Sequence, residues 1–94
     1  PLVPILSFKS FDEVIERANN NDLGLCSYIC TNSMEKAHRA SELMETGTVA
    51  VNTGVVALPE APFGGIKQTG YGREGGSMAI KDYLNVKYTH LGIQ

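Results

Sequence analysis

Three stretches of this chain are apolar on both of their alternating faces. They cover residues 2–9, 25–30 and 48–52. A strand that is apolar on both faces is typical of a parallel sheet covered by helices on its two sides. We therefore predict three parallel strands at these positions.

The residues between the first two predicted strands follow a helical period. Ser10 stands three positions before Glu13, which is the spacing of a capping box at a helix start. An apolar stripe at i, i+3, i+4 and i+7 is formed by Phe11, Val14, Ile15 and Ala18. Glu13 and Arg17 are spaced for an ion pair on the outer face. The pattern predicts a first helix that stops within the polar run 19–22.

A second helical pattern begins at Asn32 or Ser33 and is predicted to end at Gly47. Its apolar stripe consists of Met34, Ala37, Ser41 and Met44. The order strand, helix, strand, helix, strand implies two crossover connections, which are right-handed in parallel sheets. The predicted fold class is therefore α/β, a three-layer parallel sheet with βαβαβ order.

Three further elements are predicted after the sheet. A glycine-rich loop is followed by a short helix around residues 78–84 and then by a strand-like alternation over residues 85–91. This terminal strand has no partner next to it in the sequence. Pairing with a neighbouring subunit, joining the sheet of its own chain and fraying are all compatible with the residues alone.

The glycine-rich loop spans residues 62–76 and holds six of the ten glycines of the chain. Glycine serves where the backbone needs positive φ or where two backbone segments touch. Large side chains are interleaved with these glycines, among them Phe63, Tyr71 and Arg73. This mixture predicts a folded, buried wall of a site rather than a flexible spacer.

The loop before it, residues 53–61, is unusually apolar, with four consecutive apolar residues at 55–58. It leaves the carboxyl end of the third predicted strand, which is where ligands bind in open α/β sheets. Two interpretations stay open at this point. The loop either lines a pocket for the carbon chain of a ligand or packs against a further part of the protein.

Composition indicates one ordinary soluble domain or a part of one, with 94 residues, 43% hydrophobic, 19% charged and a net charge of −2. No apolar run approaches the ~18 residues of a membrane span. The mild acidity offers no basic surface for nucleic acid or membrane lipids, so neither is expected as a partner. The chain opens at Pro1 without an initiator methionine, and we expect it to be a fragment.

Cys26 and Cys30 are the only cysteines. On a strand they would share a face at a separation of roughly 13 Å, which is too far for a disulfide. We expect two reduced core thiols, as in a cytoplasmic protein. No neighbouring base marks either cysteine as a nucleophile, and no cluster of side chains has the spacing of a metal site.

Two nucleotide-binding motifs match only in part. The segment 70–75 has the G-x-G-x-x-G spacing but follows no buried strand, and Tyr71 stands where a phosphate-binding loop requires lysine. We reject both matches. The residues alone therefore indicate an α/β piece with a structured glycine-rich wall, and no more specific function. A free-standing nucleotide-binding or assembly module remains the alternative.

The segment 62–76 resembles the Pro-Phe-Gly-Gly-x-Lys-x-Ser-Gly-x-Gly-Arg-Glu signature of aldehyde dehydrogenases, with Thr69 in place of the usual serine. Residues 11–20 and 47–52 also resemble segments of that family at the family spacing. Within the family, the succinate-semialdehyde branch is the most similar, through Arg-Glu-Gly-Gly at 73–76 followed by Ile80, Tyr83, Lys87 and Tyr88.

The resemblance implies oxidation of an aldehyde to a carboxylic acid through a cysteine thiohemiacetal and a thioester, with NAD or NADP as the oxidant. The nucleophile, the general base and the cofactor site are expected upstream of Pro1. Residues 1–84 would then be the C-terminal half of the catalytic domain, and 85–94 the oligomerisation tail. The tail is expected to join a neighbouring subunit through residues 86–91. The chain alone is expected to hold no catalytic or cofactor-binding residue and to be inactive.

The resemblance also assigns site residues. Phe63 resembles the aromatic residue that closes the substrate tunnel, and Thr53, Ala57 and Leu58 lie in the loop that resembles the substrate-contacting one. The residues expected to hold this wall in place are Asn52, Gly64, Gly65, Lys67, Gly70, Arg73 and Glu74. The succinate-semialdehyde branch often has serines where this chain has Ala57 and Leu58. Their absence favours a less polar aldehyde, unless arginines upstream of Pro1 bind the far carboxylate of the substrate alone.

Overall fold

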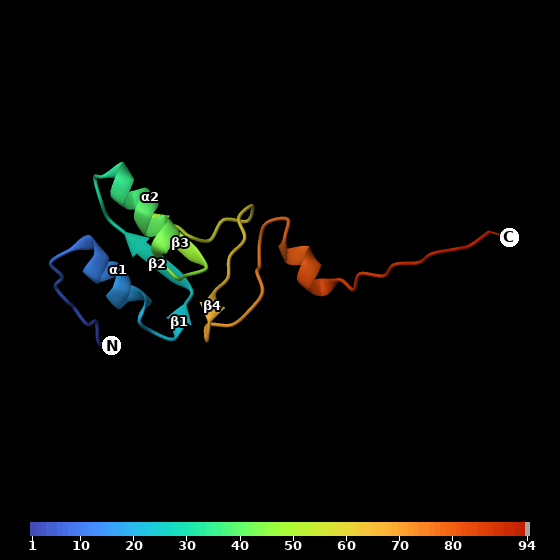
Figure 1. Ribbon diagram of the computed structural model, residues 1–94, viewed down its shortest axis with the longest axis horizontal. Helices are drawn as coiled ribbons and strands as arrows, with labels where there is room; N and C mark the ends of the chain where they lie inside the picture. The colour runs from blue at the N-terminus through green and yellow to red at the C-terminus, as the bar shows by residue number, and fades with distance from the viewer. Residues whose placement is uncertain (94) are drawn as a thin grey trace.

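The computed structural model describes residues 1–93. In chain order, its elements are α1 (Phe11–Asn19), β1 (Leu23–Gly24), β2 (Cys26–Ile29), α2 (Met34–Leu43), β3 (Thr48–Val51), β4 (Ile66–Lys67) and the 3₁₀ helix η1 (Ala79–Tyr83). Figure 1 shows the two α-helices and the strands gathered in one lobe, with an extended tail running away beyond η1. The tail gives the molecule extents of 72 × 29 × 24 Å.

Strands β2 and β3 pair in parallel, with Cys26 opposite Thr48 and Ile29 opposite Val51. Helix α2 makes the crossover between them. This confirms the second of the two predicted βαβ units. The pair ends where the Asn52 N–H donates to the Ile29 carbonyl at 2.8 Å.

The first predicted βαβ unit is wrong, because residues 2–9 form no strand. Their apolar side chains are exposed, as with Leu2 at 93% and Ile5 at 91%. A strand needs a neighbour that takes up its backbone hydrogen-bonding groups, and residues 1–93 provide none beside this segment. The predicted three-layer parallel sheet is not present in this part of the chain, which has two separate two-stranded sheets.

Side-chain caps fix the start of α1. Ser10 Oγ accepts the Glu13 N–H at 3.2 Å, and the Glu13 carboxylate accepts the Lys9 N–H at 2.8 Å. The bond from Lys9 is the main cause that lowers the pKa of Glu13. Glu13 also pairs with Arg17 at 3.1 Å, as predicted from their spacing. The helix ends at Asn19, within the predicted polar run.

Helix α2 begins after Ser33, whose Oγ accepts the Lys36 N–H at 3.3 Å. The predicted start is confirmed, whereas the predicted end at Gly47 is wrong. The helix stops at Leu43 because Met44 takes an extended backbone conformation (φ −71°, ψ 123°). Of the predicted stripe, Ala37 is buried, but Met34 at the first turn is 73% exposed.

The core of the lobe is small. Its buried hydrophobic side chains are Ala37, Ala40 and Ala50, and no large side chain among the described residues is fully buried. Cys26 is half-buried and Cys30 is exposed. The prediction of two core thiols is therefore wrong: Cys26 is only partly covered, and Cys30 lies beyond the end of β2.

The predicted short helix is present as η1, but the predicted strand over residues 85–91 is not. These residues lie in the extended tail, where Val86 is fully exposed. Nothing within residues 1–93 pairs with the tail backbone. Gln94, the last residue of the predicted tail 85–94, lies outside the described residues. No helix in the described part of the chain is long and apolar enough to cross a membrane.

Candidate functional site

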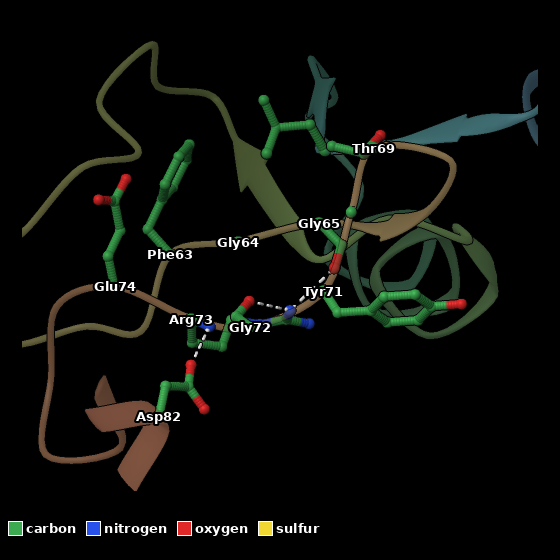
Figure 2. Close-up of a pocket in the computed structure, with 11 residues that line it drawn as sticks. Phe63, Gly64, Gly65, Thr69, Tyr71, Gly72, Arg73, Glu74 and Asp82 are labelled. Atoms are coloured by element: carbon green, nitrogen blue, oxygen red, sulfur yellow. Dashed lines mark hydrogen bonds between the residues drawn. The ribbon is translucent and has the colours of Figure 1, made fainter. Parts of the chain in front are cut away.

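The glycine-rich segment folds back on itself. Phe63 and Glu74 exchange two backbone hydrogen bonds, N–H to carbonyl at 2.7 Å and 2.8 Å. Residues 63–74 therefore form a closed loop, which we call the glycine-rich hairpin. Directly opposed residues of an antiparallel pair share a face, and Figure 2 shows the Phe63 and Glu74 side chains on one side of the hairpin.

The Arg73 side chain joins the two arms of the hairpin. Its Nη1 donates to the Gly65 and Gly72 carbonyl oxygens, both at 2.8 Å. A Cβ on Gly64 would overlap the Gly72 carbonyl and lie 2.8 Å from the Arg73 Cδ. The two arms thus approach too closely for a side chain at position 64, and close packing requires glycine there.

A short antiparallel ribbon attaches the hairpin to the lobe. Strand β4 of the hairpin pairs with β1, with Leu23 opposite Lys67 and Gly24 opposite Ile66. Thr69 Oγ1 also accepts the Gly24 N–H at 2.8 Å. The hairpin is therefore fixed to the segment that leads into the parallel sheet.

Lys67 is the most connected of the predicted scaffold residues. Its Nζ donates to the carbonyl oxygens of Asn19 (2.8 Å) and Asn21 (3.2 Å) and pairs with the Glu45 carboxylate at 2.6 Å. The side chain thus reaches the end of α1 and the turn before β3. Its backbone has φ 57°, a left-handed conformation that is uncommon for a residue other than glycine.

Asn52 also has a positive φ, at 54°. Its side-chain amide exchanges two hydrogen bonds with the Thr31 backbone, each at 2.9 Å. Asn52 therefore ties the end of β3 to the segment after β2, at the carboxyl edge of the sheet. The remaining scaffold glycines lie in the hairpin: Gly65 is buried, and the Gly70 N–H closes a turn on the Lys67 carbonyl at 3.3 Å.

Three of the four predicted substrate-binding residues meet at one hollow. This hollow, of about 330 Å³, is lined by Ala57, Leu58, Pro59, Phe63, Glu74 and Gly75, and we call it the loop-side hollow. The Gly76 N–H donates to the Pro59 carbonyl at 2.8 Å and holds the loop against the hairpin. The lining is apolar apart from the Glu74 carboxylate and exposed backbone.

Thr53 lies apart from the loop-side hollow. Its Oγ1 accepts the Val55 N–H at 3.1 Å, so its hydroxyl stabilises a local turn. Asp82 is a residue of the site that sequence reasoning missed. Its carboxylate accepts the Arg73 N–H at 3.0 Å, and it lines a second hollow, to which Phe63 and Glu74 also contribute (Figure 2). No motif marks it, because the contact joins the side chain of a 3₁₀-helix residue to a backbone N–H of the hairpin.

Neither the segment 70–75 nor the acidic, histidine and cysteine side chains of residues 1–93 are arranged as a known type of nucleotide or metal site. The G-x-G-x-x-G spacing at 70–75 leads into turns and the five-residue η1, not into a long helix whose N-terminus could face a pyrophosphate. No group of three or more His, Cys, Asp or Glu side chains in residues 1–93 is arranged to hold a metal ion. We assign no residue of this chain to NAD(P).

Comparison with known proteins identifies the family. The sequence profile of the aldehyde dehydrogenase family matches residues 1–89, and the chain belongs to that family. It is 49% identical over 92 residues to 3-sulfolactaldehyde dehydrogenase of Pseudomonas putida, and 42% identical over 93 residues to an NADP(+)-dependent succinate-semialdehyde dehydrogenase of Escherichia coli. These alignments cover 98% and 99% of this chain, which spans 19% of the length of each relative.

Solved structures agree with this assignment. The NAD⁺ complex of an aldehyde dehydrogenase from Bacillus cereus superposes with a TM-score of 0.89 at 42% identity, over 95% of this chain and 18% of that one. An aldehyde dehydrogenase from Brucella melitensis superposes with a TM-score of 0.86 at 44% identity, over 89% of this chain and 17% of that one. The family predicted from residues 62–76 is thus confirmed.

Proposed function

We propose that this chain is a C-terminal segment of an NAD(P)-dependent aldehyde dehydrogenase and forms one wall of its aldehyde channel. The observation that carries the proposal is the loop-side hollow, which Ala57, Leu58 and Phe63 line together. The nucleophile, the general base and the cofactor site belong to the rest of the enzyme. Residues 1–84 would contribute to the catalytic domain, and residues 86–91 of the tail would pair with a neighbouring subunit.

Exposed apolar surface supports the view that this chain packs against further protein. Leu2, Ile5, Val86 and Ile93 are each more than 90% exposed, whereas the buried hydrophobic side chains are all alanines. Exposed apolar side chains are costly in water, and so many of them on a small chain are typical of a surface that packs against further protein. Both cysteines are free thiols, which supports a reducing compartment such as the cytoplasm.

The proposed substrate is a short aldehyde with an acidic group at its far end. Relatives named for succinate semialdehyde, glutarate semialdehyde and 3-sulfolactaldehyde support this class. The loop-side hollow offers such a molecule apolar contacts and one carboxylate, Glu74, but no cation among its lining residues. We infer that this wall contacts the carbon chain, and that the acidic group is bound by residues outside these 94.

The activity can be tested by comparing the complete enzyme with the 94-residue chain. We expect the complete enzyme to oxidise succinate semialdehyde with NAD or NADP, followed as cofactor absorbance, and the isolated chain to show no turnover. The reason is that the described residues offer apolar contacts but no activated nucleophile. Turnover by the isolated chain would contradict the proposal, as would a complete enzyme that oxidises no aldehyde. Micromolar binding of a dinucleotide to the isolated chain would instead support the nucleotide-binding alternative.

Phe63→Ala in the complete enzyme should change substrate preference more than stability. Removing the half-buried ring enlarges the loop-side hollow, so kcat/KM for a bulky aldehyde relative to acetaldehyde should rise by about tenfold, the order expected for a change in pocket size. Steady-state kinetics with a series of aldehydes measures this ratio. His38→Ala on α2 is the control and should leave the ratio unchanged, because that ring is exposed and lines neither hollow of the hairpin. An equal loss with every aldehyde would assign Phe63 to packing instead.

A further inference from the structure

Asp82 makes a contact that joins two separate parts of the chain. It lies in η1, and its Oδ2 accepts the Arg73 N–H of the glycine-rich hairpin at 3.0 Å. Within residues 1–93 this is the only hydrogen bond between η1 and the hairpin. Figure 2 shows the Asp82 side chain below the hairpin and the Phe63 ring on the opposite side.

The approach of the carboxylate depends on Gly72. This residue has φ 92°, and a Cβ there would lie 3.0 Å from Asp82 Oδ2. Both the conformation and the close approach favour glycine at this position. The backbone is therefore shaped so that a carboxylate from η1 can reach the Arg73 N–H.

A path of bonded residues leads from Asp82 through the hairpin to Phe63 in the proposed substrate wall. Arg73 is bonded to Asp82 through its N–H and to Gly65 through its guanidinium. The next residue, Glu74, exchanges both of its backbone hydrogen bonds with Phe63. Two hydrogen-bonded contacts, joined by the Arg73–Glu74 peptide bond, thus connect the Asp82 carboxylate to the Phe63 backbone.

We propose that Asp82 is a positioning residue that sets the place of Phe63 in the aldehyde channel; this rests on the proposed function. The carboxylate holds the Arg73 peptide, and the Glu74–Phe63 pair transmits that position to the wall.

The test uses the complete enzyme with Asp82→Ala, Asp82→Asn and the control Lys81→Ala. Lys81 lies in the same turn, is exposed, and its side chain makes no hydrogen bond among the described residues. Asp82→Ala removes one hydrogen bond, so KM for a bulky aldehyde should rise about fivefold while kcat stays within about twofold. Asp82→Asn should have the KM of the unsubstituted enzyme, because its amide oxygen still accepts the Arg73 N–H.

Hydrogen–deuterium exchange gives a readout that does not depend on activity. In Asp82→Ala, peptides covering residues 63–74 should exchange faster, whereas Asp82→Asn and Lys81→Ala should match the unsubstituted enzyme. The proposal is overturned if Lys81→Ala behaves like Asp82→Ala, or if Asp82→Asn fails to restore KM and exchange. A complete enzyme without aldehyde oxidation would defeat the proposed function, and the exchange comparison would still decide whether Asp82 holds the hairpin.

Discussion

Replacing Gly47 with alanine is expected to cause the largest loss of stability of any single-methyl change in this chain. A Cβ at position 47 would overlap the Gly64 carbonyl oxygen and lie 2.8 Å from the Gly64 carbonyl carbon and 3.0 Å from the Gly65 Cα. All three are backbone atoms, so no side-chain rotation relieves the overlap. We expect a loss of about 3 kcal/mol, at the upper end of the range for overpacking.

Thermal unfolding of the 94-residue chain, monitored by circular dichroism, measures this effect. A loss of that size lowers the melting temperature of a domain of this length by more than about 10 °C. Gly54→Ala is the matched control, because a Cβ at position 54 has no atom within 4 Å. Equal melting temperatures for the two variants would show that the hairpin does not lie against the start of β3.

The second large effect is expected for Lys67→Met. Methionine keeps much of the aliphatic length but removes the ammonium group that bonds the Asn19 and Asn21 carbonyls and the Glu45 carboxylate. These acceptors lie beside the end of α1, where a cation is favoured. The Lys67 side chain is 24% exposed, whereas the Glu45 side chain is 56% exposed, so water weakens the ion pair. We therefore expect a loss of about 2 kcal/mol that comes mainly from the bonds to the two carbonyls.

Urea unfolding of the variant and of Lys36→Met checks this expectation. Lys36 is exposed and its side chain has no hydrogen-bond partner among residues 1–93, so its replacement should cost less than about 0.5 kcal/mol. Similar urea midpoints for Lys67→Met and Lys36→Met would mean that the Lys67 contacts add nothing to stability. If Lys67→Met lowers stability but leaves the aldehyde preference of the complete enzyme unaltered, then Lys67 stabilises the lobe without affecting the shape of the channel.

The contacts at Gly47 and Lys67 explain how a lobe with a core of alanines can hold the glycine-rich hairpin in one position. The hairpin is attached by backbone pairing of β1 with β4, by the close approach at Gly47 and Gly64, and by the Lys67 side chain. These contacts are polar or steric and bury little apolar area. The lobe can therefore orient the loop-side hollow while its apolar surface stays available for packing in the complete enzyme.

The local elements were predictable because their causes are local. The serine caps at Ser10 and Ser33 and the apolar periodicity that follows each fixed where α1 and α2 begin. The parallel pairing of β2 with β3 followed from the helix between two apolar runs. The family likewise followed from consecutive residues in 62–76, since a motif is itself a local pattern.

The tertiary structure decided the contacts between distant segments that no local pattern encodes. Residues 2–9 and 85–91 carry strand patterns, yet neither is a strand, because a strand exists only where a second strand takes up its hydrogen bonds. The pairing of Phe63 with Glu74 and the contact of Asp82 with Arg73 left no mark in the residue pattern. The family resemblance pointed to Ala57, Leu58 and Phe63 as residues of one wall, but the hollow that they share is a tertiary feature. The sequence by itself determined the helices, one parallel strand pair and the family. Three-dimensional contact between separate segments determined the geometry of the site.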